Sequence, residues 1–381
     1  MIGNRTDEKV TLKRLFPISQ PSIGAKEIEY VTDAVTSGWV SSLGRYIEGF
    51  EQAFAEFCGT EYALAVSNGT TGLHLALASL GIRSGDEVII PDLTFIATAN
   101  AVTYTGATVV PVDVDAVTLC IDVEAARQAI TPRTRAIIPV HLYGQPANMD
   151  AVAAVAREYR LQVVEDAAEA HGAKYRGRRV GSIGDCGVFS FYGNKIITSG
   201  EGGMLTTNRR DLYLQARLLR DHAMSSEKRY WHTAVGYNYR MTNLQAALGL
   251  AQLERIGAFI EKKRQIMEWY RAGLASNPRL QLNRDSDDSQ GVYWMVCLEV
   301  EGLREAEREQ LIRALKSEGV DSRPYFYPIS DMPMYARAIT PVTHDVSQRG
   351  INLPSYYDLA QDDVALICSI VNRVVGELRL L

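Results

Sequence analysis

The chain has 381 residues, of which 46% are hydrophobic and 22% are charged, so it is long enough for two domains or for one large domain with an appendage. Forty Lys and Arg residues against 45 Asp and Glu residues give a net charge of −5, so there is no basic excess with which to bind a nucleic acid backbone. No stretch approaches the roughly 20 apolar residues of a membrane span, and residues 1–14 are charged where a signal peptide has an apolar segment, so we expect a soluble cytoplasmic protein with neither nucleic acid nor membrane as a partner.

The first half of the chain alternates short β-rich runs with helical patterns, which is typical of a parallel sheet joined by crossover helices. The predicted fold class is therefore α/β, with a mostly parallel central sheet covered by helices on both faces. The expected strands cover residues 62–66, 87–90, 108–112, 136–139, 162–165, 187–191 and 203–207, and the expected helices cover residues 70–80, 94–105 and 149–159. Residues 193–202 are polar and rich in glycine, and a loop of this kind inside an ordered core indicates a site.

The second half begins with a predicted helix at residues 242–255 and a long charged helix at residues 258–277. Glu261, Lys262, Lys263 and Arg264 should lie on the solvated side of that helix. A smaller C-terminal α+β unit is expected from residues 292–300, 304–318, 320–326 and 362–380. We place the boundary between a large domain, residues 1–255, and a small domain, residues 256–381.

The cysteines and histidines give no sign of a metal centre. The five cysteines are an odd number without close pairs, so a disulfide framework and a thiolate metal site are both disfavoured, and we expect reduced, mostly buried thiols. The six histidines are too scattered for a metal site, so each is expected to be structural. Only His171, which directly follows the Asp166 segment, is a further candidate for the site.

Three segments carry residues that suit chemistry. Ser67 to Gly72 lies between a strand and a helix, where free backbone N–H groups can surround an anion, although an ordinary turn and helix cap has the same composition. Asp166 ends a buried strand, where it needs a positive partner such as a protonated pyridine nitrogen unless it only caps a helix.

The third segment runs from Ser190 to Lys195 at the edge of the glycine-rich loop. A lysine there becomes a nucleophile when desolvation lowers its pKa, although most lysines are merely solvated. Phe95 offers a flat apolar ring on which a ligand could stack, although an aromatic residue at such a place more often belongs to the core.

Taken together, the order and spacing of these segments resemble those of fold-type I pyridoxal phosphate (PLP) enzymes. More narrowly, the chain resembles the DegT/StrS-type nucleotide-sugar aminotransferases. The matching motifs are SGWVSSLG at residues 37–44, SNGT at 67–70, EDAA at 165–168, HGA at 171–173, GEGG at 200–203 and GYNYRMT at 236–242.

The resemblance implies a role for each matching residue. Lys195 would be the Schiff-base lysine, Asp166 the partner of the pyridine nitrogen and Phe95 the ring stacked on PLP, while Gly69, Thr70 and Ser190 would bind its phosphate. Glu169 would face the phenolic oxygen of PLP, where many relatives have Gln. Asn238 would come from the neighbouring subunit, which implies a homodimer with shared sites, possibly a dimer of dimers. Contacts with the substrate are expected from Ser41, Arg240, Arg323 and Tyr327.

The resemblance also implies the reaction. Glutamate would give its amino group, leaving 2-oxoglutarate, and the acceptor would be C4 of a nucleotide-linked 4-keto-6-deoxy sugar, with GDP-4-keto-6-deoxymannose favoured, in the biosynthesis of a surface polysaccharide. Ser330 stands where similar enzymes often carry a histidine near the sugar. A 3-keto sugar, a UDP- or dTDP-linked sugar, a keto-octulosonate, or a non-catalytic relative that binds PLP or sugar stay open as alternatives.

Overall fold

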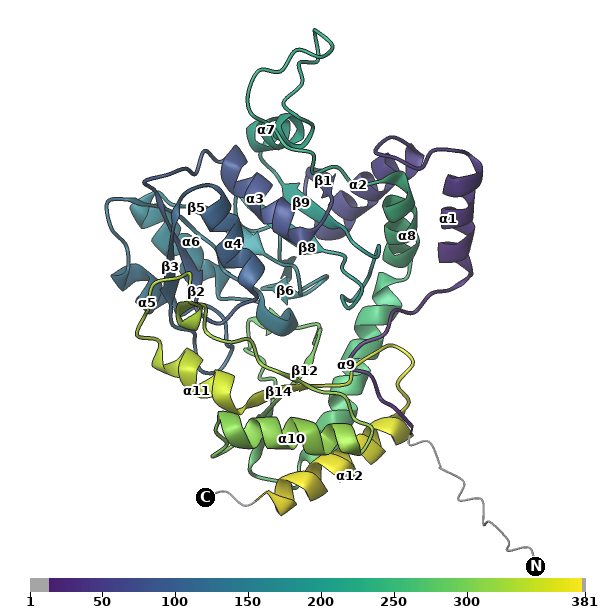
Figure 1. The fold of residues 1–381 in the computed structure, drawn as a ribbon, viewed down its shortest axis with the longest axis vertical. Coiled ribbons are helices and arrows are strands. Elements are labelled where there is room, and N and C mark those ends of the chain that lie inside the picture. Colours follow the sequence, from purple (N-terminus) through teal and green to yellow (C-terminus); the bar gives the residue numbers. More distant parts are fainter. Residues whose placement is uncertain (1–13, 379–381) are drawn as a thin grey trace, which may run out of the picture.

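A seven-stranded sheet forms the centre of the computed structural model, which describes residues 14–378 (Figure 1). The strands follow the order β1-β9-β8-β5-β4-β2-β3. Only β9 runs antiparallel to its neighbours, so the predicted α/β class with a mostly parallel sheet is confirmed. The strands are β1 Tyr62–Val66, β2 Glu87–Pro91, β3 Thr108–Val112, β4 Thr134–Ile137, β5 Gln162–Asp166, β8 Cys186–Ser190 and β9 Gly203–Thr207.

Helices cover both faces of this sheet because successive strand residues point to opposite sides. Val164 and Val188 contribute to one apolar core, whereas Val163 and Phe189 contribute to the other. The first core is closed by α3 Gly69–Ser79, α4 Ile96–Tyr104 and α7 Arg210–Arg220, and the second by helices that include α2 Arg45–Cys58, α6 Met149–Tyr159 and α8 Asn243–Glu254. The remaining helices of this half are α1 Ala25–Thr36 and α5 Val123–Gln128.

A second sheet lies below the first in Figure 1, with order β10-β12-β14-β13. Its strands are β10 Leu280–Leu282, β12 Val296–Val300, β13 Arg323–Pro324 and β14 Gly350–Leu353, and its helices are α9 Ile256–Leu274, α10 Glu305–Ser317, α11 Pro341–Arg349 and α12 Gln361–Glu377. A small third sheet joins β11 Ser289–Gln290 to β6 Lys174–Tyr175 and β7 Arg178–Arg179. The predicted boundary at residues 255 and 256 coincides with the start of α9 and stays a prediction.

Several predicted elements differ from the structure. The strand predicted at residues 292–300 begins only at Val296, because Tyr293 has a left-handed φ of 49° that no regular strand accommodates. The strand predicted at residues 136–139 is β4, which lies two residues earlier. Residues 320–326 form only the two-residue β13, and β14, which pairs with both β12 and β13, was not predicted.

The prediction that Lys263 lies on the solvated side of its helix is wrong. Lys263 is only 7% exposed, because its amine turns inward and donates to the backbone oxygens of Trp294 and Ser355. All five cysteines are buried free thiols, as predicted.

Two predictions fall partly on residues that the structure leaves undescribed. The charged segment at residues 1–14 lies outside the described residues except for Arg14, and so does the end of the helix predicted at residues 362–380. Among residues 14–378, no helix is long and apolar enough to cross a bilayer.

Candidate active site

A cavity of about 550 Å³ opens at the carboxyl ends of β2, β5 and β8. This is the edge of a parallel sheet at which α/β proteins place their ligands. The sequence predicted seven of the residues that line it: Gly69, Thr70, Phe95, Asp166, Glu169, Ser190 and Lys195.

Asp166 lies at the floor of the cavity, where β5 ends. Its carboxylate accepts hydrogen bonds from the Thr98 hydroxyl at 2.7 Å and from the Ala168 N–H at 3.2 Å. Burial raises the pKa of Asp166 above its usual value, against the effect of these two donors. A carboxylate has about four acceptor positions, so Asp166 can still receive a proton donor from a ligand.

Lys195 reaches the same cavity from the glycine-rich loop, and its side chain is only 11% exposed. Its Nζ lies 3.5 Å from Glu169 Oε1 and 3.8 Å from the centre of the Trp294 ring. Burial lowers the pKa of Lys195, against the attraction of Glu169 and Asp166. The amine is thereby shifted toward its neutral, nucleophilic form.

Glu169 is fixed beside Lys195 from the other side. Its Oε2 accepts a hydrogen bond of 2.8 Å from the Tyr143 N–H. Tyr143 has a left-handed φ of 53°, an uncommon conformation for a residue with a side chain. Burial raises the pKa of Glu169 above its usual value, against the attraction of Lys195 and the hydrogen bond from Tyr143.

The start of α3 forms the opposite wall. The Asn68 side chain accepts the Thr71 N–H and so begins the helix, which leaves the amides of Gly69 and Thr70 in the first turn without an intrahelical acceptor. A Cβ on Gly69 would lie 3.0 Å from the Cβ of Ser190, so glycine lets the helix start approach the Ser190 side chain closely. Free amides beside a hydroxyl suit a phosphate group.

An aromatic wall completes the cavity. Phe95 is 54% exposed, which is unusual for phenylalanine and leaves a ring face free. Its ring lies 5.7 Å from that of Phe326, which reaches the cavity from the segment after β13. A flat aromatic ligand would find a stacking surface here.

The predicted substrate residues do not line the cavity of this chain. Arg240 pairs with Asp221 at 2.7 Å and also donates to Asn238, while Arg323 pairs with Asp321. Tyr327 accepts a hydrogen bond from Arg308, and Ser41 is exposed. The predicted roles of these residues, including the role of Asn238 in a partner's site, stay predictions.

Ser330 does not line the cavity either. It is fully buried, where its hydroxyl and its N–H both donate to the carboxylate of Asp92. The expectation that this position lies near the sugar is therefore not met within this chain.

Among the cavity residues that the sequence did not predict are Trp294, Phe326, Tyr104 and Asn194. Trp294 lies in the segment 292–300 and Phe326 in the segment 320–326 of the predicted small unit, far along the chain from the predicted cofactor motifs. Asn194 precedes Lys195 directly, and its position in the loop was the one available signal.

The residues present fit the cofactor that the resemblance implies. A phosphate would meet the start of α3 and Ser190, a flat ring would lie against Phe95, and a ring nitrogen would face the spare acceptor positions of Asp166. An aldehyde carbon would then need an amine, and Lys195 is the only lysine among the described residues that line the cavity.

Comparisons with known proteins agree with this chemistry. Residues 21–372 match the DegT/DnrJ/EryC1/StrS aminotransferase family. The chain is 46% identical over 368 residues to the GDP-perosamine synthase of Caulobacter vibrioides, covering 94% of this chain and 98% of that protein. It is also 46% identical over 366 residues to the GDP-perosamine synthase of Escherichia coli O157:H7, covering 96% and 100%. The PLP form of a putative sugar aminotransferase from Streptococcus pneumoniae superposes with a TM-score of 0.91 at 28% identity, covering 95% of this chain and 99% of that one.

Proposed function

Because the chain belongs to the DegT/DnrJ/EryC1/StrS aminotransferase family, we propose that it uses PLP to move an amino group from glutamate to C4 of GDP-4-keto-6-deoxymannose, which gives GDP-perosamine for a polysaccharide. The observation that carries the proposal is the buried group of Lys195, Glu169 and Asp166 in one cavity. The nearly full-length similarity to two GDP-perosamine synthases supports the choice of acceptor.

The chain's own residues would divide the work. PLP, when bound, supplies an electron sink that stabilises negative charge on the carbon that loses a proton. Asp166 would hold the ring nitrogen protonated, and its burial makes that ion pair strong. Lys195 would bind the cofactor through Nζ and, once released, take the proton from the α-carbon of glutamate as a general base.

Glu169 would hold a proton on Oε1, next to the place of the cofactor's phenolic oxygen. Its raised pKa supports this, because two negative oxygens side by side would repel each other. The Tyr143 N–H keeps the carboxyl group from turning away. Trp294 would exclude water from Lys195 by covering its amine.

The charges of the cavity support a homodimer with shared sites. Among the described residues that line the cavity, Lys195 is the one basic side chain, whereas Asp166, Glu169 and Glu201 are acidic. Glutamate, a diphosphate and a cofactor phosphate are all anions, so further cations must come from outside this set.

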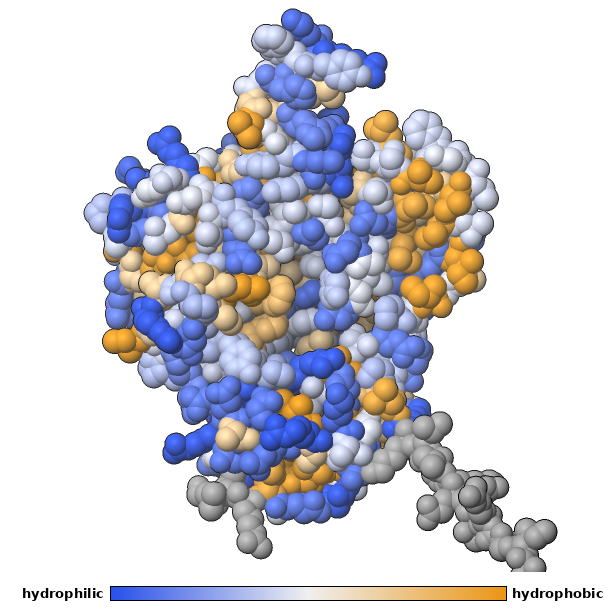
Figure 2. Space-filling model, in the orientation of Figure 1, coloured by the Kyte–Doolittle hydropathy of each residue, from blue (hydrophilic) through white to orange (hydrophobic). Residues whose placement is uncertain are grey.

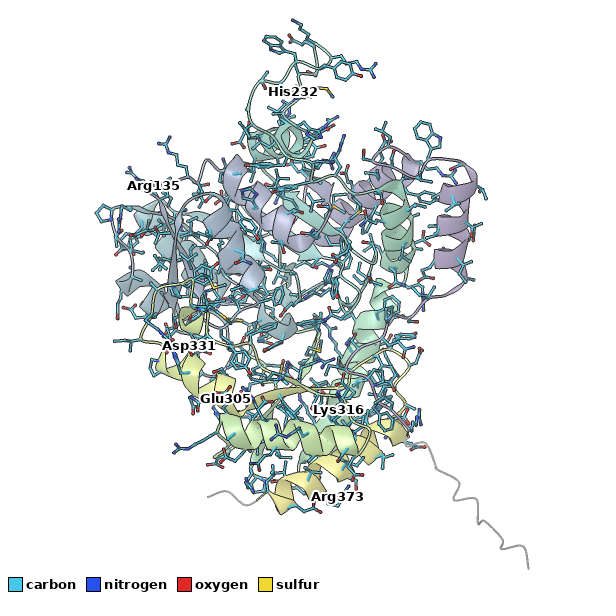
Figure 3. The ribbon with its side chains drawn as sticks, viewed as in Figure 1. Arg135, His232, Glu305, Lys316, Asp331 and Arg373 are labelled. Carbon is cyan, nitrogen blue, oxygen red and sulfur yellow. The ribbon has the colours of Figure 1, made fainter. Side chains whose placement is uncertain are left out.

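A second copy of the chain would supply these cations, and two exposed surfaces of the molecule suit contact with such a copy. Residues 221–238 project beyond α7, with His232 partway along the projection, and carry the exposed side chains Tyr230, Trp231 and Val235 (Figures 1 and 3). Figure 2 shows an apolar patch over α1, where Ile28 and Val35 are exposed. Monomeric proteins rarely expose such surfaces.

Incubation with glutamate and a panel of nucleotide-linked keto sugars tests the proposed function. Product masses should show amination of GDP-4-keto-6-deoxymannose, with little product from UDP- or dTDP-linked or 3-keto acceptors. Amination of another acceptor alone would overturn the choice of sugar. No conversion of the cofactor to its amine form by glutamate would overturn the aminotransferase.

A further inference from the structure

Lys263 is a buried lysine outside the cavity that the proposed mechanism does not use. Its Nζ donates to the backbone oxygen of Trp294 at 2.9 Å, to the Ser355 hydroxyl at 2.9 Å and to the backbone oxygen of Ser355 at 2.5 Å. These three bonds use all the donors of an ammonium group. Burial lowers the pKa of Lys263 to about 7, and no acidic side chain within residues 14–378 pairs with it.

Burial of this amine costs stability, so packing alone does not account for it. An apolar side chain of similar length would fill the same space without desolvating a charge. Unlike an apolar side chain, a lysine forms hydrogen bonds with two backbone carbonyl groups, one in the segment that leads to β12 and the other just after β14.

The first of these positions belongs to the residue that covers Lys195. Trp294 is 5% exposed, and its ring lies 3.8 Å from Lys195 Nζ. Its indole N–H donates to the backbone oxygen of Asn194 at 2.7 Å, in the peptide that leads into Lys195. The tryptophan therefore contacts both the side chain and the backbone of the lysine segment.

The backbone before Trp294 needs to be held. Tyr293 has a φ of 49°, a conformation that persists in a bulky residue only where the surroundings enforce it. The Tyr293 hydroxyl donates to Asp285 at 2.7 Å on one side of this residue. Lys263 and the Ser355 hydroxyl hold the Trp294 carbonyl on the other side.

We propose that Lys263 is a positioning residue for Lys195, and that it acts by fixing the Trp294 carbonyl so that the indole ring stays on the Lys195 amine. The inference rests on the proposed function of Lys195. Misplacement of a reacting amine by about 1 Å slows a reaction by up to about 100-fold without a matching loss of substrate binding.

The test compares Lys263→Met with Lys262→Met in the PLP-loaded full chain. Lys262 is the neighbouring lysine, and its Nζ lies over the Trp269 ring instead. The single-turnover rate with saturating glutamate, the glutamate concentration at half saturation and the midpoint of thermal unfolding are measured for each. Lys263→Met should slow the rate about tenfold or more with half saturation little changed, whereas Lys262→Met should match the parent.

Coupling with Trp294 separates positioning from a general loss of stability. In a Trp294→Leu background, Lys263→Met should slow the rate no further, because the ring it positions is gone. Ser355→Ala removes one partner of Lys263 and should act in the same direction, more weakly, which keeps the test usable if Lys263→Met does not fold.

Each contrary outcome has a distinct meaning. The positioning role is overturned if Lys263→Met reacts at the parent rate, or if the effects of Lys263→Met and Trp294→Leu multiply. If Lys263→Met does not fold, a parent rate in Ser355→Ala overturns it instead. If the parent protein itself does not react with glutamate, the proposed function fails, and the inference fails with it.

Discussion

Two adjacent carboxylates on β5 show how this fold separates structure from chemistry. Glu165 and Asp166 follow each other in the strand, so they point to opposite faces of the sheet. Glu165 accepts the N–H groups of Gly181, Ile183 and Gly184, each at 2.7 Å, and lies 3.0 Å from the Nε2 of His141. Asp166 accepts two donors and faces the cavity.

The pKa values of the two groups diverge accordingly. Burial disfavours ionisation of both, but the hydrogen bonds from His141 and the backbone leave the pKa of Glu165 below its usual value. The pKa of Asp166 stays above its usual value. A buried carboxylate whose acceptor positions are all hydrogen-bonded stabilises the fold, whereas one with free acceptor positions is suited to bind a ligand.

Removal of the amine that faces Asp166 should have the largest effect. Lys195→Ala deletes the one lysine among the described residues that line the cavity, and with it the amine placed to bind the cofactor and to move the proton, so turnover should fall to background. The visible absorbance of the bound cofactor should change as well, which a spectrum measures directly. Lys174→Ala, in β6 and outside the cavity, serves as the control and should keep both. Parent turnover in Lys195→Ala would remove this residue from the mechanism.

Asp166→Asn should cost activity and spare the fold. The rate should fall by about 100-fold or more, because a charge that stabilises the reacting state is lost. Because the pKa of Asp166 is raised in the folded state, ionisation of this carboxyl group lowers the stability of the fold as the pH rises through that pKa. At pH 8 the variant should therefore unfold at a denaturant concentration no lower than that of the parent. A stable variant with the parent rate would contradict the role of Asp166.

Glu165→Gln should do the reverse. An amide would turn donors toward the N–H groups and His141, at a cost of about 3 kcal/mol in the free energy of unfolding, with activity kept in the folded fraction. The lowered pKa means that Glu165 stabilises the fold fully above about pH 4.3 and that this contribution is lost as the pH falls through the folded pKa. Urea unfolding at pH 7 and pH 4 measures this; equal stability of variant and parent at pH 7 would break the comparison.

His171 provides the smallest and most specific test. Unlike His141, it pairs with no acidic side chain in residues 14–378, and burial lowers its pKa to about 3. Below about pH 6.5 the unfolded chain binds a proton that the folded chain refuses, so His171 makes the fold less stable as the pH falls toward 3. His171→Leu should flatten the loss of stability between pH 6.5 and 4.5 in urea unfolding. An unchanged slope would show that His171 is already charged in the fold.

Much of the sheet and seven of the twenty residues that line the cavity could be predicted because their signals are local. Buried strands such as residues 162–165 stand out as apolar runs, and Gly69, Asp166 and Lys195 lie at strand ends whose motifs are contiguous. The order of these motifs along the chain was enough to bring them to one edge of a parallel sheet.

The rest depends on contacts between distant segments. Trp294 contacts Lys195 although about a hundred residues separate them in the chain. The contact depends on the left-handed backbone of Tyr293, which no sequence pattern predicts. Lys263 sits within a run of charges, and such a run predicts a solvated face unless neighbouring carbonyl groups are known. The basic residues that the proposed anionic substrates need are, apart from Lys195, not among the described residues that line the cavity.

The most direct measurement is to identify the lysine that carries the cofactor. The protein loaded with PLP is reduced with borohydride, which fixes the cofactor to whichever amine holds it, and is then digested and analysed by mass spectrometry. The added mass should lie on the peptide that contains Lys195 and be absent from Lys195→Ala. A label on any other lysine, or no label at all, would contradict the account.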